Sequence, residues 1–205
     1  MRFLAAILIL AGITAIQAET MQERRWRAAS VSLNRFAEAG RVVSRIESNR
    51  QRYQAVESKT SVPWHVIAGL HNMEASGSFR HHLHEGSPLS GRTRWAPKGR
   101  PKTGVPPFTW EVSAADALLF DRMNAVDWKS LEATLYACER YNGVGYLKYH
   151  PETPTPYLWA GTSIERPGKY VADGKWSSTA RSNQIGIAAI WKIMESRRVL
   201  KIPNR

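Results

Sequence analysis

Glu74 is the residue of this sequence best suited to acid chemistry. It ends an apolar run within residues 71–87, HNMEASGSFRHHLHEGS, where small residues and a histidine cluster follow it. Side chains three and four positions apart share a helix face, so Glu74 would lie beside Leu70 and His71 at the edge of an apolar stripe. A carboxyl group there loses hydration, which raises its pKa and suits it to donate a proton near neutral pH. The alternative is an ordinary solvated carboxylate at a helix end.

Glycosidic cleavage normally needs a second polar group that handles water or stabilises positive charge on the sugar. The segment after the helix offers four such groups, and spacing singles out none: Glu85, Ser87, Ser90 and Thr93. Three histidines lie in the same segment: His81, His82 and His84. Their tight spacing matches no strong zinc motif, so we expect a polar cleft lining and neither a metal ion nor another cofactor.

The elements that must position these side chains are predicted to be mainly helical. Apolar spacing favours helix across 22–58, with an interruption at Gly40, and again from the Thr60/Ser61 cap to a stop at Gly77. Proline and glycine punctuate 78–108, which predicts a loop with a small antiparallel excursion. Further helices are expected from Thr109, from about Asp127 to 142–143, and over 179–196, after a loop across 144–178.

The N-terminal sequence and the charge of the chain predict an exported, strongly basic protein. Arg2 followed by an apolar run over 3–16 predicts a signal peptide at 1–18, too short to serve comfortably as a membrane anchor. Its removal would leave one fewer than the 29 Lys+Arg of the chain against 17 Asp+Glu. A strongly basic exported protein is suited to an acidic wall matrix, although general solubility explains the charge equally well. Cys138 is the single cysteine, so no internal disulfide can form.

Several motifs in order resemble one known superfamily. The segment VPWHVIAGLHNMEASGSF resembles the first motif of the lysozyme-like superfamily, a helix that delivers a catalytic Glu. The segment RYNGVGY resembles the Tyr-Asn-(Gly/Ala) motif of transglycosylases and goose-type lysozymes. From about Arg52 to Met194 it resembles a group of bacterial and phage lysozyme-like peptidoglycan hydrolases. The segments that carry this resemblance are RYQAVESKTSVPW, HLHEGSPL, RPKTGVPPFTWEVSAADAL, YNGVGYLKYH, PYLWAGT and GKYVADGKW.

The resemblance implies a mainly α, α+β lysozyme-like fold: a helical two-lobed domain with a small β-hairpin excursion and a glycan cleft. The domain would cover 51–205, preceded by an N-terminal helical region at 19–50. Glu74 takes the place of the general acid. In phage-type lysozymes an Asp, and a Thr six residues after it, follow the Glu, and Ser87 and Thr93 stand at that step here. HLHxGDPL is the commoner form of the motif, so Ser87 stands where an Asp is expected. Glu85, two residues away, could take the role of that Asp.

The residues expected to bind substrate combine this resemblance with the amphipathic character of aromatic rings, which suits them to sugar faces. They are His84, Trp110, Tyr141, Asn142, Tyr146, Tyr157, Trp159 and Tyr170. About half of the aromatic residues are expected to be core instead.

The leading hypothesis is a periplasmic or secreted muramidase that cleaves between N-acetylmuramic acid and N-acetylglucosamine. Glu74 would be the acid, and Thr93 with Glu85 or Ser87 would orient water. A lytic reaction, in which one Glu acts as acid and then base, stays open. The alternative is a catalytically weakened relative that binds peptidoglycan or docks to an envelope or secretion assembly. Nucleic-acid binding is disfavoured by export and by the lack of a recognised motif.

Overall fold

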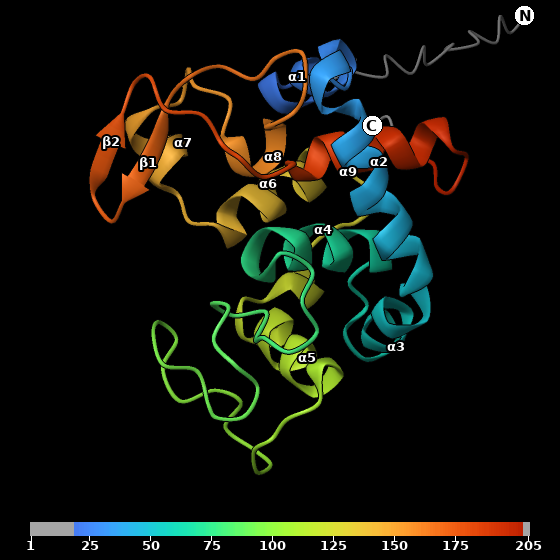
Figure 1. The fold of residues 1–205 in the computed structure, drawn as a ribbon, viewed down its shortest axis with the longest axis vertical. Helices are drawn as coiled ribbons and strands as arrows, with labels where there is room; N and C mark the ends of the chain where they lie inside the picture. Colours follow the sequence, from blue (N-terminus) through green and yellow to red (C-terminus); the bar gives the residue numbers. More distant parts are fainter. Residues whose placement is uncertain (1–18, 203–205) are drawn as a thin grey trace, which may run out of the picture.

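The computed structural model describes residues 19–202, and the signal peptide predicted at 1–18 lies outside them. The described chain is mainly helical with one small antiparallel sheet, as predicted (Figure 1). The elements, in chain order, are α1 (Met21–Ala28), α2 (Leu33–Ser48), α3 (Arg50–Thr60), α4 (Trp64–Ala75), α5 (Trp110–Phe120), the 3-10 helix η1 (Met123–Ala125), α6 (Leu131–Tyr141), α7 (Gly145–Tyr149), α8 (Pro156–Trp159), β1 (Lys169–Ala172), β2 (Lys175–Ser177) and α9 (Ile187–Ser196).

The N-terminal region consists of three helices where the sequence predicted one with a break at Gly40. The breaks fall instead at 29–32 and at Asn49, and Gly40 lies inside α2. Trp26 of α1 is buried and packs edge-on against Trp191 of α9, with ring centroids 6.2 Å apart. The first two helices therefore share one hydrophobic core with the rest of the chain.

Helix α4 crosses the middle of the molecule between α3, α5 and α9 (Figure 1). It is buried along most of its length and ends at Ala75, where Ser76 adopts the left-handed conformation that caps the helix. Gly69 makes the approach of α9 possible, because a Cβ there would lie 3.0 Å from Ile187 Cγ2. The apolar sequence of α4 thus places its last turn, with Glu74, at the end of a buried helix.

The β-hairpin was predicted in the wrong place. Within 78–108 the backbone forms a long irregular loop with an isolated bridge between His81 and Pro88. The antiparallel pair is β1–β2, which turns at Asp173 and Gly174 inside the segment predicted to be loop. Asp-Gly is a favoured hairpin turn, since both residues tolerate the backbone angles that it needs.

The later helix boundaries follow local caps. Thr109 accepts a hydrogen bond from the Val112 N–H and starts α5, as predicted, whereas Ser130 rather than Asp127 caps α6. The closing helix begins at Ile187, later than predicted. None of the helices described between residues 19 and 202 combines the length and apolarity that a bilayer crossing needs.

Candidate functional site

Glu74 lies partly buried in the last turn of α4, where Tyr157 donates a hydrogen bond to it. The distance from Tyr157 Oη to Glu74 Oε1 is 2.7 Å. Burial raises the pKa of Glu74 to about 7, since its charged form loses hydration, although the Tyr157 hydrogen bond lowers it. The sequence-based prediction of a desolvated carboxyl group is confirmed, and the solvated alternative does not apply. Near neutral pH this side chain exists both as acid and as base.

One further group acts on the Glu74 carboxyl, and Glu74 in turn acts on a tyrosine. The negative charge of Asp121, at the end of α5, adds to the rise of the Glu74 pKa. Tyr141, the last residue of α6, has its own pKa raised first by burial and then by the charges of Glu74 and Asp121. Its hydroxyl donates to the Leu83 carbonyl at 3.2 Å. The Glu74 carboxyl at the end of α4 thus contacts α8 through Tyr157 and interacts electrostatically with residues at the ends of α5 and α6.

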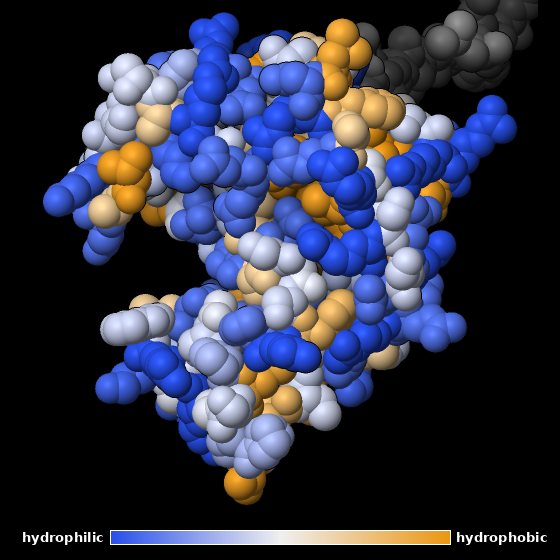
Figure 2. Space-filling view, viewed as in Figure 1, coloured by the Kyte–Doolittle hydropathy of each residue, from blue (hydrophilic) through white to orange (hydrophobic). Residues whose placement is uncertain are grey.

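A groove of about 470 Å³ begins beside Glu74, and we refer to it as the tyrosine groove. It is lined by Met73, Asn142, Gly143, Gly145, Tyr146, Tyr149, Pro156, Tyr157, Lys169, Tyr170, Ala172, Asp173, Gly174, Ser182 and Gln184. Figure 2 shows the surface hollowed between the part that carries β1 and β2 and the part that carries the 78–108 loop. The groove thus contains both Met73, next to the acid in sequence, and Tyr157, bonded to it.

The wall of the tyrosine groove is an aromatic cluster assembled by α7 and the β-hairpin. Tyr146 packs edge-on against Tyr170, with ring centroids 5.5 Å apart, and against Trp176 at 5.6 Å. His150 stacks on Trp176 at 3.5 Å. These contacts fix the two tyrosines that line the groove, so it offers preformed aromatic surface with polar tips.

The predicted substrate-binding residues divide between this groove and other places. Four of them line it: Asn142, Tyr146, Tyr157 and Tyr170. Trp110 and Trp159 lie in the core instead, with 1% and 0% of their surface exposed, so neither ring has a face open to a ligand. Trp110 packs against Tyr53 and His71, because α5 lies against α3 and α4.

The loop after the acid touches the end of the acid's own helix. Gly86 has φ +77°, and a Cβ there would lie 2.9 Å from the main-chain oxygen of Glu74. This contact brings the neighbouring Glu85 and Ser87 to the helix end. The Ser87 hydroxyl donates to Glu85 Oε1, while Glu85 Oε2 is buried without a hydrogen-bond partner among the described residues.

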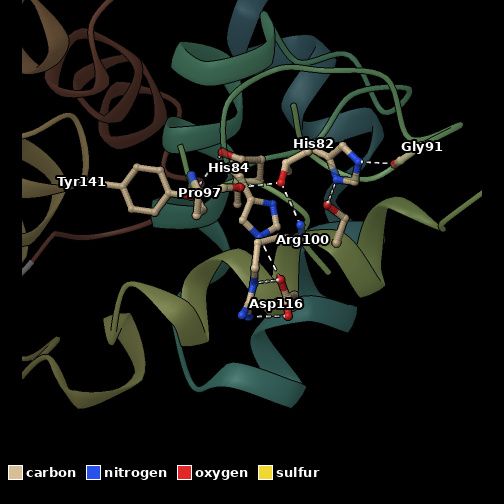
Figure 3. Close-up of polar contacts among 10 residues, drawn as sticks. His82, His84, Gly91, Pro97, Arg100, Asp116 and Tyr141 are labelled. Atoms are coloured by element: carbon tan, nitrogen blue, oxygen red, sulfur yellow. Dashed lines mark hydrogen bonds and ion pairs between the residues drawn. The ribbon is translucent and has the colours of Figure 1, made fainter. Parts of the chain in front are cut away.

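The predicted site residues Thr93 and His84 hold the loop together. Thr93 Oγ1 accepts the Arg100 N–H at 2.8 Å and donates to the Pro97 carbonyl. His84 Nε2 lies 2.9 Å from Asp116 Oδ2, and Figure 3 shows the His84 ring directed toward Asp116 with Arg100 beside it. Burial lowers the pKa of His84, against the opposing effect of Asp116. Both side chains thus have structural partners within the loop and α5.

The remaining histidines also have protein partners. His82 Nδ1 lies 2.6 Å from the Ser113 hydroxyl and Nε2 lies 2.8 Å from the Gly91 carbonyl, so both ring nitrogens are engaged (Figure 3). His81 Nδ1 lies 2.8 Å from the Ser78 hydroxyl. Between residues 19 and 202 no group of three or more His, Cys, Asp or Glu side chains is arranged to hold a metal ion.

Sequence reasoning missed Asp121, Lys169, Asp173 and Gln184. Lys169, Asp173 and Gln184 line the tyrosine groove, and Gln184 also donates to the Met73 carbonyl at 2.9 Å. The Asp-Gly turn signal could have located the hairpin and with it Asp173. No local signal marks Asp121, because its place beside Glu74 depends on how α5 packs.

Comparisons of this chain with protein-family models, with curated proteins and with solved structures find no match.

Proposed function

We propose that the protein is an exported muramidase, a glycosidase that cleaves peptidoglycan between N-acetylmuramic acid and N-acetylglucosamine. One observation carries the proposal: burial holds the pKa of Glu74 at about 7, and its hydrogen-bond partner Tyr157 lines a groove rich in tyrosines. A carboxylic acid that is substantially protonated near neutral pH meets the first requirement of glycosidic general-acid catalysis. Peptidoglycan is the substrate that the motif resemblance implies.

In this mechanism Glu74 protonates the oxygen that leaves the anomeric carbon. As the proton departs, negative charge develops on the carboxylate, and the Tyr157 hydroxyl already donates to Oε1. Hydrogen bonds that strengthen as charge develops stabilise the transition state more than the ground state. Tyr157 is therefore a positioning group for the acid as well as part of the groove lining.

The tyrosine groove supports binding of an extended sugar chain in a lysozyme-like glycan cleft. Tyr146 and Tyr170 offer ring faces and hydroxyl groups, and the exposed Asn142 offers an amide to sugar hydroxyls. His84 and Tyr141, also expected to bind substrate, do not line this groove: the His84 side chain is buried against Asp116, and the Tyr141 hydroxyl donates to the Leu83 carbonyl of the 78–108 loop.

The second partner in the reaction distinguishes a hydrolase from a lytic enzyme. Glu85 and Ser87 flank Gly86, which meets the main-chain oxygen of Glu74, and the Ser87 hydroxyl donates to Glu85. The Thr93 hydroxyl is bonded to the Arg100 N–H and the Pro97 carbonyl, so Thr93 would contribute by fixing the conformation of the loop rather than by binding water directly. A lytic reaction would need Glu74 alone, because the sugar's own hydroxyl would attack.

The test is mass spectrometry of muropeptides released from purified peptidoglycan by the wild-type protein, Glu74→Gln and the control Glu132→Gln. Glu132 is exposed on α6, so this control makes the same chemical change away from the groove. We expect release by the wild type and Glu132→Gln and none by Glu74→Gln. Full release by Glu74→Gln would remove this carboxyl from the mechanism, and no release by the wild type would refute the muramidase proposal.

A second candidate function is glycan binding without catalysis, alone or within an envelope or secretion assembly. The observation that favours it is the Ser at position 87, where related motifs carry Asp, together with the bond from Ser87 to Glu85. The discriminating variant is Ser87→Asp. If this variant cleaves peptidoglycan and the wild type only binds it in a pull-down assay, the binding function is correct.

A further inference from the structure

The segment 86–110 carries charge of one sign. It contains five Lys and Arg residues and neither Asp nor Glu. Arg100 pairs with Asp116 at 2.7 Å, and Arg92 donates to a main-chain carbonyl of the same segment. The other three cations are exposed and form no ion pair or side-chain hydrogen bond within residues 19–202: Arg94, Lys98 and Lys102. The segment therefore presents positive charge that the described chain does not neutralise.

Hydrogen bonds close the central part of this segment, residues 92–105, which we refer to as the basic loop. Arg92 Nη2 donates to the Gly104 carbonyl at 2.8 Å and so joins its two ends. Inside the loop the Gly99 N–H donates to the Thr93 carbonyl at 2.9 Å. A closed backbone of this kind gives the side chains on its outer surface a defined place.

Two large apolar side chains are exposed on the basic loop together with the cations. Trp95 is 71% exposed and Val105 is 83% exposed. Trp95 alone is exposed among the eight tryptophans, all of which lie within residues 19–202. It directly follows the unpaired Arg94. Single exposed apolar side chains are ordinary on protein surfaces, whereas two on one closed loop with three unpaired cations form a mixed cationic and apolar surface.

The basic loop projects from the molecule. Figure 1 shows the 78–108 loop at the end of the molecule opposite α1. Neither Trp95 nor Val105 lines the tyrosine groove. A projecting surface of this kind can meet an extended flat surface, whereas a polymer strand is better enclosed by a groove.

We propose that the basic loop binds the surface of an anionic phospholipid bilayer. The phosphate groups of such a surface attract lysine and arginine side chains that come near it. A tryptophan ring is favoured at the level of the headgroups, where its apolar face meets the acyl chains and its N–H meets polar groups. The exposed Val105 points to a bilayer rather than to a hydrated acidic wall polymer, because only the bilayer offers an apolar environment to an aliphatic side chain.

This binding would be a reversible surface contact that depends on both parts of the basic loop. Its electrostatic part should weaken as salt is added, because salt screens exposed charges. Its apolar part should persist in salt, since burial of Trp95 and Val105 does not depend on charge. The inference does not rest on the proposed cleavage of peptidoglycan.

The first experiment is cosedimentation of the purified protein with vesicles of phosphatidylcholine alone and of an equimolar mixture with phosphatidylglycerol. We compare the wild type, the double variant Lys98→Gln/Lys102→Gln and the control Lys129→Gln/Lys175→Gln, which removes two exposed charges outside the basic loop. The wild type and the control should bind the anionic vesicles and not the neutral ones. The loop variant should bind roughly 25-fold more weakly, at about fivefold for each lost charge.

Two results of this experiment would overturn the proposal. Absence of wild-type binding to the anionic vesicles would refute the membrane surface outright. An equal loss of binding in the loop variant and in the control would show that net charge alone attracts the protein, with no part for the basic loop.

The second experiment tests the apolar part of the surface by tryptophan fluorescence. Anionic vesicles should shift the wild-type emission to shorter wavelength, because the Trp95 ring leaves water, and Trp95→Phe should lose this shift. Val105→Ser should weaken vesicle binding, whereas Leu33→Ser, at a side chain on α2 that is 94% exposed, should not. A wild-type protein that sediments with vesicles without any shift in emission would contradict the proposed contact of Trp95.

The competing partner and the competing function have distinct outcomes. If purified, lipid-free peptidoglycan shifts the Trp95 emission and anionic vesicles do not, the basic loop is a wall-binding surface and the proposal is wrong. Glu74→Gln should bind anionic vesicles as the wild type does, whatever its effect on cleavage. Failure of the muramidase proposal would thus leave the vesicle result unchanged, and failure of vesicle binding would leave the cleavage result unchanged.

Discussion

The Tyr157→Phe change isolates the one hydrogen bond made to the Glu74 carboxyl by a tyrosine hydroxyl. That hydroxyl donates to Oε1 over 2.7 Å and so favours the ionised form. A hydrogen bond to a charged group contributes ~1.5–3 kcal/mol, and one to a neutral carboxyl ~1 kcal/mol. The difference is roughly 1–2 kcal/mol, and ~1.4 kcal/mol corresponds to one pKa unit. We therefore expect the pKa of Glu74 to rise by about one unit above its present value of about 7.

The assay is the pH dependence of kcat/KM for muropeptide release, because this quantity reports the pKa of groups in the free enzyme. Glu74 must be protonated to act as the acid, so activity is present below its pKa and is lost as the pH rises through about 7. In Tyr157→Phe the descending limb should move to higher pH by about one unit.

Tyr141→Phe is the matched control, because the Tyr141 hydroxyl donates to the Leu83 carbonyl and not to Glu74. This variant should leave the descending limb near its wild-type pH, whatever its effect on the rate. A limb that stays in place or moves to lower pH in Tyr157→Phe would refute the assignment of Glu74 as the titrating acid.

Three further changes test the packing around the site. Gly86→Ala should lower the free energy of unfolding in urea by ~1–3 kcal/mol, because of its φ of +77° and its contact with the Glu74 carbonyl, whereas Gly91→Ala, with nothing within 4 Å, should be nearly neutral. Burial raises the pKa of Glu139 from 4.5 to about 7, so stability should fall as pH rises through that window, and Glu139→Gln should be more stable by roughly 2–3 kcal/mol at high pH in urea titrations. Trp110→Ala should lower the free energy of unfolding by ~3–5 kcal/mol and leave glycan binding by the folded protein unchanged in calorimetry.

The sequence predicted several parts of the molecule that local chemistry determines, although it missed the hairpin at the Asp-Gly turn. Thr109 starts a helix because its hydroxyl caps the first turn, and Glu74 is desolvated because the apolar run before it forms a buried helix. Trp110 and Trp159 could not be assigned in this way, since a tryptophan near a helix end suits a core as well as a sugar site. Their burial depends on which helices pack together, which the sequence alone does not reveal.

The same limit applies to the group that would handle water in the proposed reaction. The sequence-based candidates for the second group, Glu85 and Ser87 among them, all lie in the segment that follows Glu74. Asp121, whose charge adds to the rise of the Glu74 pKa, lies much farther along the chain, at the end of α5. Long-range neighbours of this kind are a product of tertiary packing, and no spacing rule within one segment identifies them.

Helix α4 is fixed along its length at two points where a side chain is missing. Gly69 admits Ile187 near the middle of the helix, and Gly86 meets the main-chain oxygen of Glu74 at its end. The contact at Gly86 is with a main-chain atom, and the contact at Gly69 is with the buried, β-branched side chain of Ile187, which has little rotational freedom, so the position of Glu74 depends on close contacts at both points. A methyl group added at either glycine would have to be accommodated by a shift of α4 or of its neighbour, and the Glu74 carboxyl would move with the helix. Substitutions at these two glycines should therefore change the rate of the proposed cleavage by moving Glu74, without altering any group that is proposed to react.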